Sequence, residues 1–321
     1  MKIGVTGANG FIGGHLLDCL LKAGHAPVAL VRNPAKVSVP AVEVVPMPTI
    51  DGNSDVAALQ SALSGLDAVV HLAASVHDMT GSQSEDAYRS INVDGSVRLF
   101  EAAIAAGMKR FVFMSSAKAA GERSQGRPLS ADNAPGPEDA YGRSKRDAET
   151  ALRRLASGSA CRLVILRPTF VYGWPPVGNF RTLLKTILKG LPLPLAAIDN
   201  RRDLTYVGNL ADAACRACSA ADLGNTPYFI CDGKAVSTPE LIRNVARAFA
   251  RPARLIYMPV WLLRLCGTVS RRSAMIDRLT EDFEVDSAPF HRDAGWQPPY
   301  NMAEGLGACA AARQNDRLGG A

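Results

Sequence analysis

Near its start the chain reads Lys2-Ile3-Gly4-Val5-Thr6-Gly7-Ala8-Asn9-Gly10-Phe11-Ile12-Gly13, an apolar run followed by three glycines at intervals of three residues. The apolar run predicts a strand, and the residues after the glycines predict a helix. Glycines between a strand and a helix allow a tight turn, let the backbone approach a pyrophosphate and let the helix pack closely. We therefore expect a dinucleotide site, the alternative being a glycine-rich turn without a ligand. Its contacts are expected from Gly7, Asn9, Gly10, Phe11, Ile12 and Gly13.

Strand-like and helical patterns alternate through the first half of the chain. Predicted strands cover Lys2–Thr6, Ala26–Val31, 68–73, 110–115 and 161–167, and predicted helices cover 11–23, Val56–Leu63, 87–106 and Ala140–Ala156. Continuous apolar strands separated by helices are typical of a parallel sheet covered on both faces. The predicted fold class is therefore α/β, a Rossmann-type doubly wound parallel sheet with a smaller C-terminal substrate-binding domain.

Prolines break the alternation after residue 167, and a strand and a helix resume near residue 204. We expect an NAD(P)-binding domain of residues 1–170 together with about 204–231. The substrate-binding domain is expected to consist of residues 171–203 and 232–321.

The composition bounds the partners of this 321-residue chain, which carries a formal net charge of +6. Its arginines are scattered without interleaved aromatic residues, so we expect an anionic small substrate such as a nucleotide diphosphate and no nucleic acid. Apolar stretches are interrupted well short of a membrane span, and no signal-peptide pattern opens the sequence, so we expect a cytoplasmic protein with no membrane partner. The seven cysteines have no framework spacing and predict reduced thiols; no metal site is expected.

The residue after the second predicted strand bears on the choice of dinucleotide. A carboxylate at this place holds the ribose hydroxyls of NAD, whereas this chain has Arg32. An arginine can pair with a 2′-phosphate through a forked hydrogen bond. NADP, as NADPH, is therefore the preferred cofactor, with NAD as the alternative. Arg32 could instead be a solvated surface arginine that contacts no cofactor.

Tyr141 and Lys145 lie four residues apart in Tyr141-Gly142-Arg143-Ser144-Lys145. On a helix this spacing places the phenol and the ammonium on one face. A free phenol, with a pKa of roughly 10, is a poor base at neutral pH, but a nearby cation lowers its pKa. The pair and the glycine turn together indicate nicotinamide redox chemistry at a carbinol.

These features resemble the extended short-chain dehydrogenase/reductase family, the NAD-dependent epimerases and dehydratases, over essentially the whole chain. Besides the glycine turn and the tyrosine–lysine pair, the matching segments are His71-Leu72-Ala73-Ala74, Asn92, Ser115-Ser116-Ala117, Arg167-Pro168-Thr169-Phe170-Val171-Tyr172-Gly173 and Arg202-Asp203. The resemblance implies that Ser116, Tyr141 and Lys145 are catalytic. It further implies cofactor contacts from Leu72, Ala73, Ala74 and Asn92, and also from Tyr141 and Lys145.

Positions after the serine separate the family's activities. Dehydratases of the family carry an Asp-Glu pair at the positions of Ala117 and Lys118, and the 3,5-epimerising enzymes carry a cysteine at the position of Lys118. Neither activity is therefore expected. What remains is 4-epimerisation through a transient ketone or net reduction of a stable ketone. Arg32 favours reduction, because the family's epimerases keep NAD bound.

Segments in the second half resemble the bacterial UDP-4-keto-6-deoxy-N-acetylglucosamine 4-reductases, also called UDP-N-acetylquinovosamine dehydrogenases, of O-antigen assembly. They are Val177-Gly178-Asn179-Phe180, Gly190-Leu191-Pro192-Leu193-Pro194 and Asp199-Asn200-Arg201-Arg202-Asp203. We therefore expect NADPH-dependent reduction of the C4 ketone of a UDP-linked amino sugar. The alternatives are a UDP-hexose 4-epimerase with tightly bound NAD and, from another class, a non-enzymatic dinucleotide sensor.

Substrate contacts are expected from His77, Ser116, Asn179, Arg201 and Arg202, with the arginines on the diphosphate. An ion pair between Arg202 and Asp203 is the alternative for the second arginine. The resemblance implies a homodimer formed through the helices at 87–106 and 140–156. Two places depart from the family pattern: Thr49-Ile50-Asp51 stands where an aspartate holds the adenine, and Asn209 replaces an aspartate.

Overall fold

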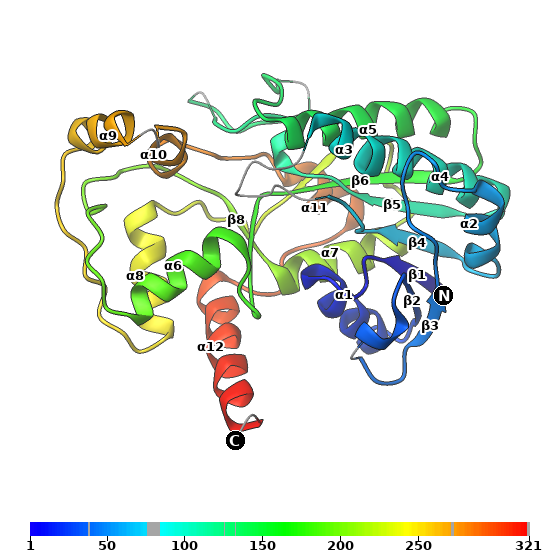
Figure 1. Ribbon diagram of the computed structural model, residues 1–321, viewed down its shortest axis with the longest axis horizontal. Helices are drawn as coiled ribbons and strands as arrows, with labels where there is room; N and C mark the ends of the chain where they lie inside the picture. Colours follow the sequence, from blue (N-terminus) through cyan, green and yellow to red (C-terminus); the bar gives the residue numbers. More distant parts are fainter. Residues whose placement is uncertain (38, 76–83, 125, 132, 271–272, 320–321) are drawn as a thin grey trace.

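A parallel sheet is the centre of the computed structural model, which describes residues 1–37, 39–75, 84–124, 126–131, 133–270 and 273–319 (Figure 1). The strands are β1 (Lys2–Thr6), β2 (Ala26–Val31), β3 (Glu43–Pro46), β4 (Ala68–His71), β5 (Arg110–Met114), β6 (Arg162–Pro168) and β9 (Tyr228–Ile230). Their order is β3-β2-β1-β4-β5-β6-β9, and neighbouring strands are parallel. The predicted Rossmann-type sheet is confirmed, and β3 is a strand that the sequence patterns did not indicate.

Helices cover both faces of this sheet. On one face, α1 (Phe11–Lys22), α7 (Val207–Ser219) and α11 (Ala288–Ala294) share a core with alternate strand residues such as Val112. On the other, α2 (Val56–Leu63), α4 (Gly95–Ala105) and α5 (Ala140–Ala156) pack on residues such as Phe111 and Phe113. Side chains alternate between the faces of a strand, so strands that are apolar throughout fill both cores.

The helix predicted at 87–106 is not continuous. It begins as α3 (Glu85–Tyr88), widens into a π-helical turn, η2 (Arg89–Asp94), and continues as α4. Such π-turns are frequent at functional sites, and this one contains Asn92. Two short 3₁₀ turns, η1 (Pro34–Lys36) and η3 (Ala117–Ala119), follow β2 and β5.

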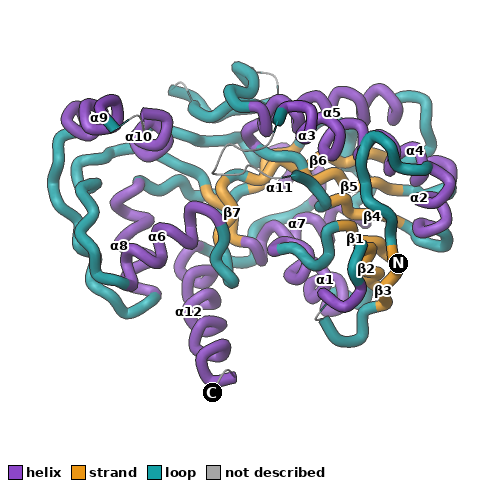
Figure 2. The backbone as a smooth tube through the Cα atoms, in the orientation of Figure 1, coloured by secondary structure: helices purple, strands orange, loops and turns teal. Residues whose placement is uncertain are grey.

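The remainder of the chain packs beside the sheet's carboxyl edge, on the left in Figure 2. It contains a parallel pair of strands, β7 (Phe170–Tyr172) and β8 (Leu204–Tyr206), with α6 (Gly178–Leu188), α8 (Thr238–Ala248), α9 (Val260–Val269), α10 (Ser273–Thr280) and α12 (Met302–Gly319). Tyr172, Phe180 and Ile242 are central members of its own apolar core. In the part of the chain that the structure describes, no helix is both long and apolar enough to cross a membrane.

The strand order reverses between β1 and β4, because the chain runs outward from β1 to β3 and then returns to β4. In open parallel sheets of this kind, ligands bind in the crevice beyond the carboxyl ends of the strands at this switch point. The glycine turn after β1, the loop after β4 and the serines after β5 all lie at this edge.

Candidate active site

The glycine turn after β1 packs closely on the loop after β4. Gly7 has a φ of +66°, and a Cβ atom on it would lie 2.9 Å from the backbone nitrogen of Ala73. A Cβ atom on Gly13 would lie 2.4 Å from the carbonyl oxygen of Gly7. Only glycine fits these two positions without displacing backbone. The turn is therefore a backbone cradle, with Asn9 and Gly10 exposed on its outer side.

The start of α1 is suited to an anion. Gly10 caps the helix without a side-chain hydrogen bond, and the first turn contains no acidic residue. Its amide groups and the positive end of the helix dipole are thus available to a phosphate. The predicted dinucleotide contacts of the glycine turn and of Leu72, Ala73 and Ala74 come together at this edge and fit the pyrophosphate of a dinucleotide.

A buried hydrogen-bond chain ties the two halves of this cradle together. The Ala73 amide donates to Thr6 Oγ1 (3.2 Å), which lies 2.7 Å from His71 Nδ1. On the other side of the ring, His71 Nε2 lies 3.1 Å from Ser96 Oγ, whose hydroxyl donates to the Asn92 carbonyl at 2.7 Å. Because each hydroxyl has one proton to give, Thr6 donates to Nδ1 and Nε2 carries the imidazole proton. Burial lowers the pKa of His71 to about 3, so the ring is neutral.

The three predicted catalytic residues lie together beyond β5. Ser116 caps η3, and its hydroxyl accepts from the Lys118 amide at 3.2 Å. The Tyr141 phenol lies near the same hydroxyl, close enough for Ser116 to lower the pKa of the phenol. Lys145, one turn along α5, is buried and donates from Nζ to the Met114 carbonyl at 2.9 Å.

The pKa of Tyr141 differs from the expectation that Lys145 lowers it. Burial raises the phenol's pKa above its usual range, and the Asp139 carboxylate raises it further, while the nearby Ser116 hydroxyl lowers it. Burial also lowers the pKa of Lys145 to about 8. The Lys145 ammonium is directed at Met114 and lies 4.8 Å from the centre of the Phe113 ring, so it does not offset the burial of the phenol. A cationic ligand beside the phenol would favour the phenolate.

Ser115 and Ser116 have different partners. Ser115 donates to Glu149 Oε1 at 2.5 Å, and Arg167 donates to both oxygens of the same carboxylate at 2.9 and 2.5 Å. This buried ion pair joins α5 to β6. The Ser115 hydroxyl is thus engaged in the scaffold, whereas the Ser116 hydroxyl lies near the Tyr141 phenol.

Asn92, predicted as a cofactor contact, fastens the loop after β4 to the catalytic helix. It is fully buried; its Nδ2 donates to the Ser75 carbonyl (2.9 Å) and to Ser144 Oγ (3.0 Å), and its Oδ1 accepts from the Ser75 amide (2.8 Å). In this structure its contacts are with protein, and they position α5 relative to the cradle.

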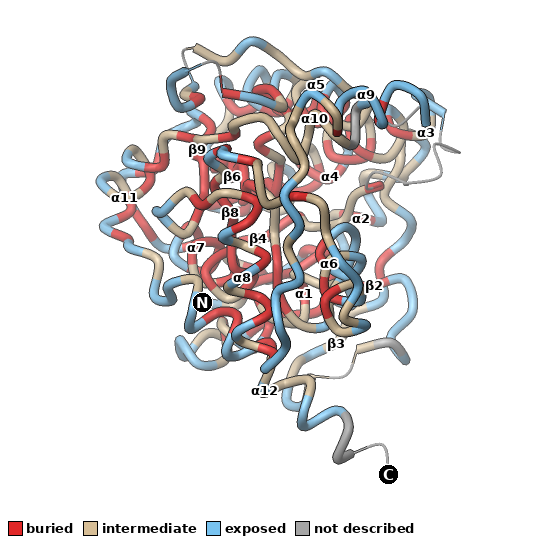
Figure 3. The backbone as a smooth tube through the Cα atoms, turned by 90° about the vertical axis from the view of Figure 1, so that its left-hand side faces the viewer, coloured by how far each residue is buried: buried red, intermediate tan, exposed pale blue. Residues whose placement is uncertain are grey.

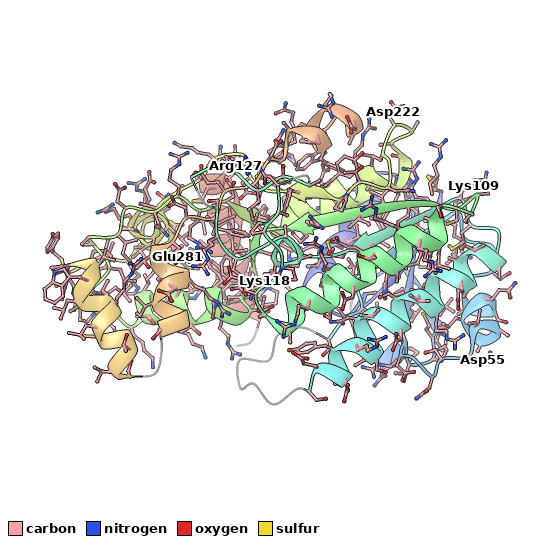
Figure 4. The ribbon with its side chains drawn as sticks, turned by 90° about the horizontal axis from the view of Figure 1, so that it is seen from above. Asp55, Lys109, Lys118, Arg127, Asp222 and Glu281 are labelled. Atoms are coloured by element: carbon pink, nitrogen blue, oxygen red, sulfur yellow. The ribbon has the colours of Figure 1, made fainter. Side chains whose placement is uncertain are left out.

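A cluster of charged side chains beside Ser116 and Tyr141 was missed by the sequence reasoning. Lys118 Nζ lies 2.5 Å from Asp139 Oδ2 and 3.2 Å from Glu122 Oε1. Asp139 also caps α5 by accepting from the Gly142 amide, and Lys118 holds the pKa of Asp139 below its usual range against the effect of burial. Arg278, from α10, completes the cluster by donating to Glu122 at 3.1 Å. Figure 4 labels Lys118 and Glu281 near the middle of the molecule.

The predicted substrate arginines have different surroundings. Arg202 donates to the Glu281 carbonyl at 2.9 Å and stacks 5.4 Å from the centre of the Phe283 ring, while Asp203 accepts instead from the Val285 amide. Arg201 is exposed and paired with Glu284 at 2.9 Å. The Arg202–Asp203 ion pair considered as an alternative is therefore absent between these two described residues.

Other predicted positions are spread around this edge. Asn179 is exposed in the first turn of α6, and Arg32 is exposed after β2, where no ion pair to it is found among the described residues. His77 lies outside the described residues.

The two departures from the family pattern have structural roles. Asn209 is buried and binds Asp232 Oδ1 (2.7 Å) and the backbone of Tyr300. Asp51 packs against Gly95 at the start of α4.

Comparisons with known proteins agree with this geometry. Residues 3–231 match the model of the NAD dependent epimerase/dehydratase family. The chain belongs to this family. A UDP-glucose 4-epimerase of Vibrio cholerae is 35% identical over 313 residues, covering 96% of this chain and 94% of the relative.

Two further matches span almost the whole chain. The N-acetyl-alpha-D-glucosaminyl-diphospho-ditrans,octacis-undecaprenol 4-epimerase of Escherichia coli O157:H7 is 26% identical, covering 94% of this chain and 92% of that one. The structure of MoeE5 in complex with UDP-glucose and NAD superimposes with a TM-score of 0.77 at 25% identity, covering 99% of this chain and 100% of that one. This family member thus shares its fold with a protein whose structure contains NAD.

Proposed function

We propose that the protein is a nicotinamide-dependent 4-epimerase of a UDP-linked hexose or N-acetylhexosamine. The observation that carries this proposal is the neighbouring Ser116 and Tyr141 side chains, with Lys145 one helical turn away, beside a backbone cradle that fits a dinucleotide. The full-length similarity to the UDP-glucose 4-epimerase of Vibrio cholerae supports the choice of reaction within the family.

In the proposed mechanism the side chains handle the proton at the C4 oxygen. Reversible hydride transfer at C4 is the chemistry that a bound nicotinamide supplies. Tyr141 accepts the proton of the C4 hydroxyl and returns it once the other face of the sugar is presented. Ser116 hydrogen-bonds the same oxygen and stabilises its negative charge. Positioning of this oxygen and proton transfer together account for the rate, the latter contributing about 10²- to 10⁴-fold.

Lys145 and Asn92 position the groups that take part in this proton transfer. The ammonium of Lys145 is held by the Met114 carbonyl, and from there it would orient the nicotinamide ribose of a bound cofactor. Asn92 holds Ser144 and thereby α5, so that the phenol keeps its place relative to the cradle.

The reduction favoured by the sequence is the second candidate, and Arg32 is the observation that supports it. An exposed arginine after β2 suits the 2′-phosphate of NADPH, which a reductase must exchange at each turnover. The substrate in that case is a UDP-4-keto-6-deoxy-N-acetylhexosamine and the product UDP-N-acetylquinovosamine or its C4 epimer. The complex of MoeE5 with NAD and UDP-glucose supports NAD as the cofactor and a UDP-hexose as the ligand instead.

For the substrate diphosphate we propose Asn179 and Arg202, with Arg201 more peripheral. The Arg202 guanidinium has one hydrogen bond to a carbonyl and one face on Phe283, which leaves further donors for a phosphate. We also propose that residues 171–203 and 232–321 form the substrate-binding domain and that residues 1–170 with about 204–231 form the cofactor-binding domain. We further propose a homodimer that forms through α4 and α5, and a cytoplasmic location.

The deciding experiment incubates the purified protein with UDP-glucose and, separately, UDP-N-acetylglucosamine, without added cofactor, and looks for the 4-epimer by NMR. Epimer formation with cofactor that copurifies supports the proposal. In parallel, NADPH and NADH oxidation is followed with UDP-4-keto-6-deoxy-N-acetylglucosamine. If NADPH is oxidised and neither UDP-sugar gives an epimer, the proposed epimerase function is wrong and the reductase function takes its place.

A further inference from the structure

Apolar side chains are exposed together along one edge of the molecule. Among the described residues, nine large apolar side chains are exposed, and five of them fall between residues 256 and 269. This set, called here the α9 surface, consists of Ile256, Tyr257, Trp261, Leu265 and Val269. Single exposed apolar residues are ordinary on a protein surface, but a contiguous group marks an interaction site.

The spacing within α9 makes this surface one face of a helix. Trp261, Leu265 and Val269 follow one another at intervals of four residues and are 67%, 53% and 79% exposed. Leu263 and Gly267 form the opposite, buried face, where a Cβ atom on Gly267 would lie 2.8 Å from Ile276. The helix thus needs its inner face for packing against α10, and the outer stripe has no structural role in the chain.

The segment leading into α9 extends this surface down the same side. Residues 254–256 are hydrogen-bonded along Leu193, through Leu193 N to the Arg254 carbonyl (2.8 Å) and Ile256 N to the Leu193 carbonyl (2.9 Å). The side chains of Ile256 and Tyr257 project beyond this contact and are 50% and 74% exposed. Figure 3 views the molecule from this side and draws much of the segment as exposed.

The charge of this region is one-sided. Residues 241–276, between Glu240 and Asp277, contain seven arginines and no acidic residue or lysine, so the rest of the chain is nearly neutral. Of these, Arg251, Arg254 and Arg264 are exposed; Arg264 is adjacent in sequence to Leu265, and Arg254 lies two residues before Ile256. The arginines are therefore less scattered than the composition indicated.

We propose that the α9 surface docks the protein on an anionic phospholipid membrane. A helix with tryptophan and leucine on one face and arginine beside them is the composition that lies in the plane of a bilayer interface. Tryptophan and tyrosine are enriched at the depth of the headgroups, and arginines are attracted to anionic lipids. Two copies of this surface would bring like charges together, because the charged residues between positions 254 and 269 are both arginines, Arg254 and Arg264.

This inference goes beyond the proposed function and differs from the expectation that no membrane takes part. It concerns peripheral attachment, and it adds a lipid surface as a partner. Since α9 lies at the end of the molecule away from the sheet (Figure 1), docking would place the smaller part of the chain, rather than the sheet, next to the bilayer.

The test is co-sedimentation of the full chain with vesicles of phosphatidylglycerol and phosphatidylcholine, against phosphatidylcholine alone. We expect binding to the anionic vesicles, a blue shift of Trp261 fluorescence and weaker binding as salt increases. The double variant Trp261→Ser, Leu265→Ser should lose binding, and Arg264→Glu should lower the partition coefficient about tenfold. Melting temperatures check that these exposed changes leave the fold intact.

Lys109→Glu is the matched control, because it reverses one exposed charge at the opposite end of the molecule (Figure 4). It should keep wild-type binding. Equal binding of Arg264→Glu and Lys109→Glu, or no binding of the wild type at low salt, would overturn the proposal. So would a change of oligomeric mass in the double variant without any effect on vesicle binding, since the face would then join two copies. Epimerase activity on soluble UDP-sugars should be unchanged in all variants, and its absence would bear only on the proposed function.

Discussion

Lys118 and Asp139 form an ion pair of 2.5 Å that joins the segment after Ser116 to the cap of the helix carrying Tyr141. The pair brings a cation close to a carboxylate that raises the pKa of the Tyr141 phenol. Lys118 thereby limits the electrostatic cost of forming the phenolate, although it lies at the position where other family activities use different chemistry.

Lys118→Met should shift the activity profile to higher pH. Without the ammonium, the charges of Asp139 and Glu122 act more strongly on Tyr141 and raise its pKa further. At neutral pH we expect about a tenfold lower kcat, recovered in part at alkaline pH. Arg123→Met is the control, because Arg123 forms comparable ion pairs with Glu138 and Glu281. An unshifted profile in Lys118→Met would contradict this role.

Tyr141→Phe should remove the proton-transferring group while preserving the ring. The expected loss in kcat is about 10²- to 10⁴-fold, with cofactor affinity retained. Tyr88→Phe provides a matched phenol deletion, since the Tyr88 ring lies edge-on to Tyr141 with the ring centres 6.2 Å apart. Tyr88→Phe should keep activity within a few-fold. Turnover of Tyr141→Phe near the wild-type rate would remove Tyr141 from the mechanism.

Gly13 and Gly14 offer a direct comparison of adjacent glycines in α1. A Cβ atom on Gly13 would collide with the Gly7 carbonyl, whereas one on Gly14 would meet no heavy atom within 4 Å. Gly13→Ala should therefore weaken NAD(H) binding and destabilise the fold by about 1–3 kcal/mol. Gly14→Ala should keep cofactor binding and stabilise by roughly 1 kcal/mol or less. Equal cofactor affinity in the two variants, measured by titration calorimetry, would show that the cradle does not need Gly13.

Local pattern was sufficient for much of the fold. The glycine turn and the Tyr141–Lys145 spacing are short-range features whose geometry is fixed by one strand, one turn or one helix. The π-turn around Asn92 was not predictable, because its extra residue follows from bonds to Ser75 and Ser144, distant in sequence. The short edge strand β3 carries too few apolar residues to stand out.

The charged cluster around Lys118 could not be predicted from the sequence for a similar reason. Lys118, Asp139 and Arg278 come from three separate segments and look like solvated surface charges when each is taken alone. The exposure of Trp261 likewise depends on which face of α9 packs on α10. In both cases the deciding information is the packing of one part of the chain on another.

We expect Arg202 to contact the substrate, whereas Arg201 forms a surface ion pair. Arg202 stacks on Phe283 and is largely shielded, whereas Arg201 is exposed and paired with Glu284. Arg202→Lys should raise KM for the UDP-sugar about tenfold, because lysine cannot form a forked pair with a phosphate. Arg201→Lys should change KM less than about twofold. Steady-state kinetics measures both KM values. An equal increase in KM for the UDP-sugar in the two variants would contradict the assignment.

His71 makes the stability of the fold depend on acid. Burial lowers its pKa to about 3, while an unfolded histidine has a pKa of about 6.5. Between these values the unfolded chain binds a proton that the folded chain does not. The stabilisation is therefore complete above about pH 6.5 and is lost as the pH falls toward about 3, on the order of 5 kcal/mol at most.

His71→Asn removes this titration but interrupts the hydrogen bonds to Thr6 and Ser96, at a cost of about 1–3 kcal/mol. We expect the variant to melt below the wild type at neutral pH, and the gap to narrow as the pH falls through the window. His25→Asn, at a partly exposed histidine, should show a small and nearly constant gap. Thermal unfolding across this pH range measures both differences. A gap for His71→Asn that stays constant with pH would mean that burial does not hold the ring neutral in the folded protein.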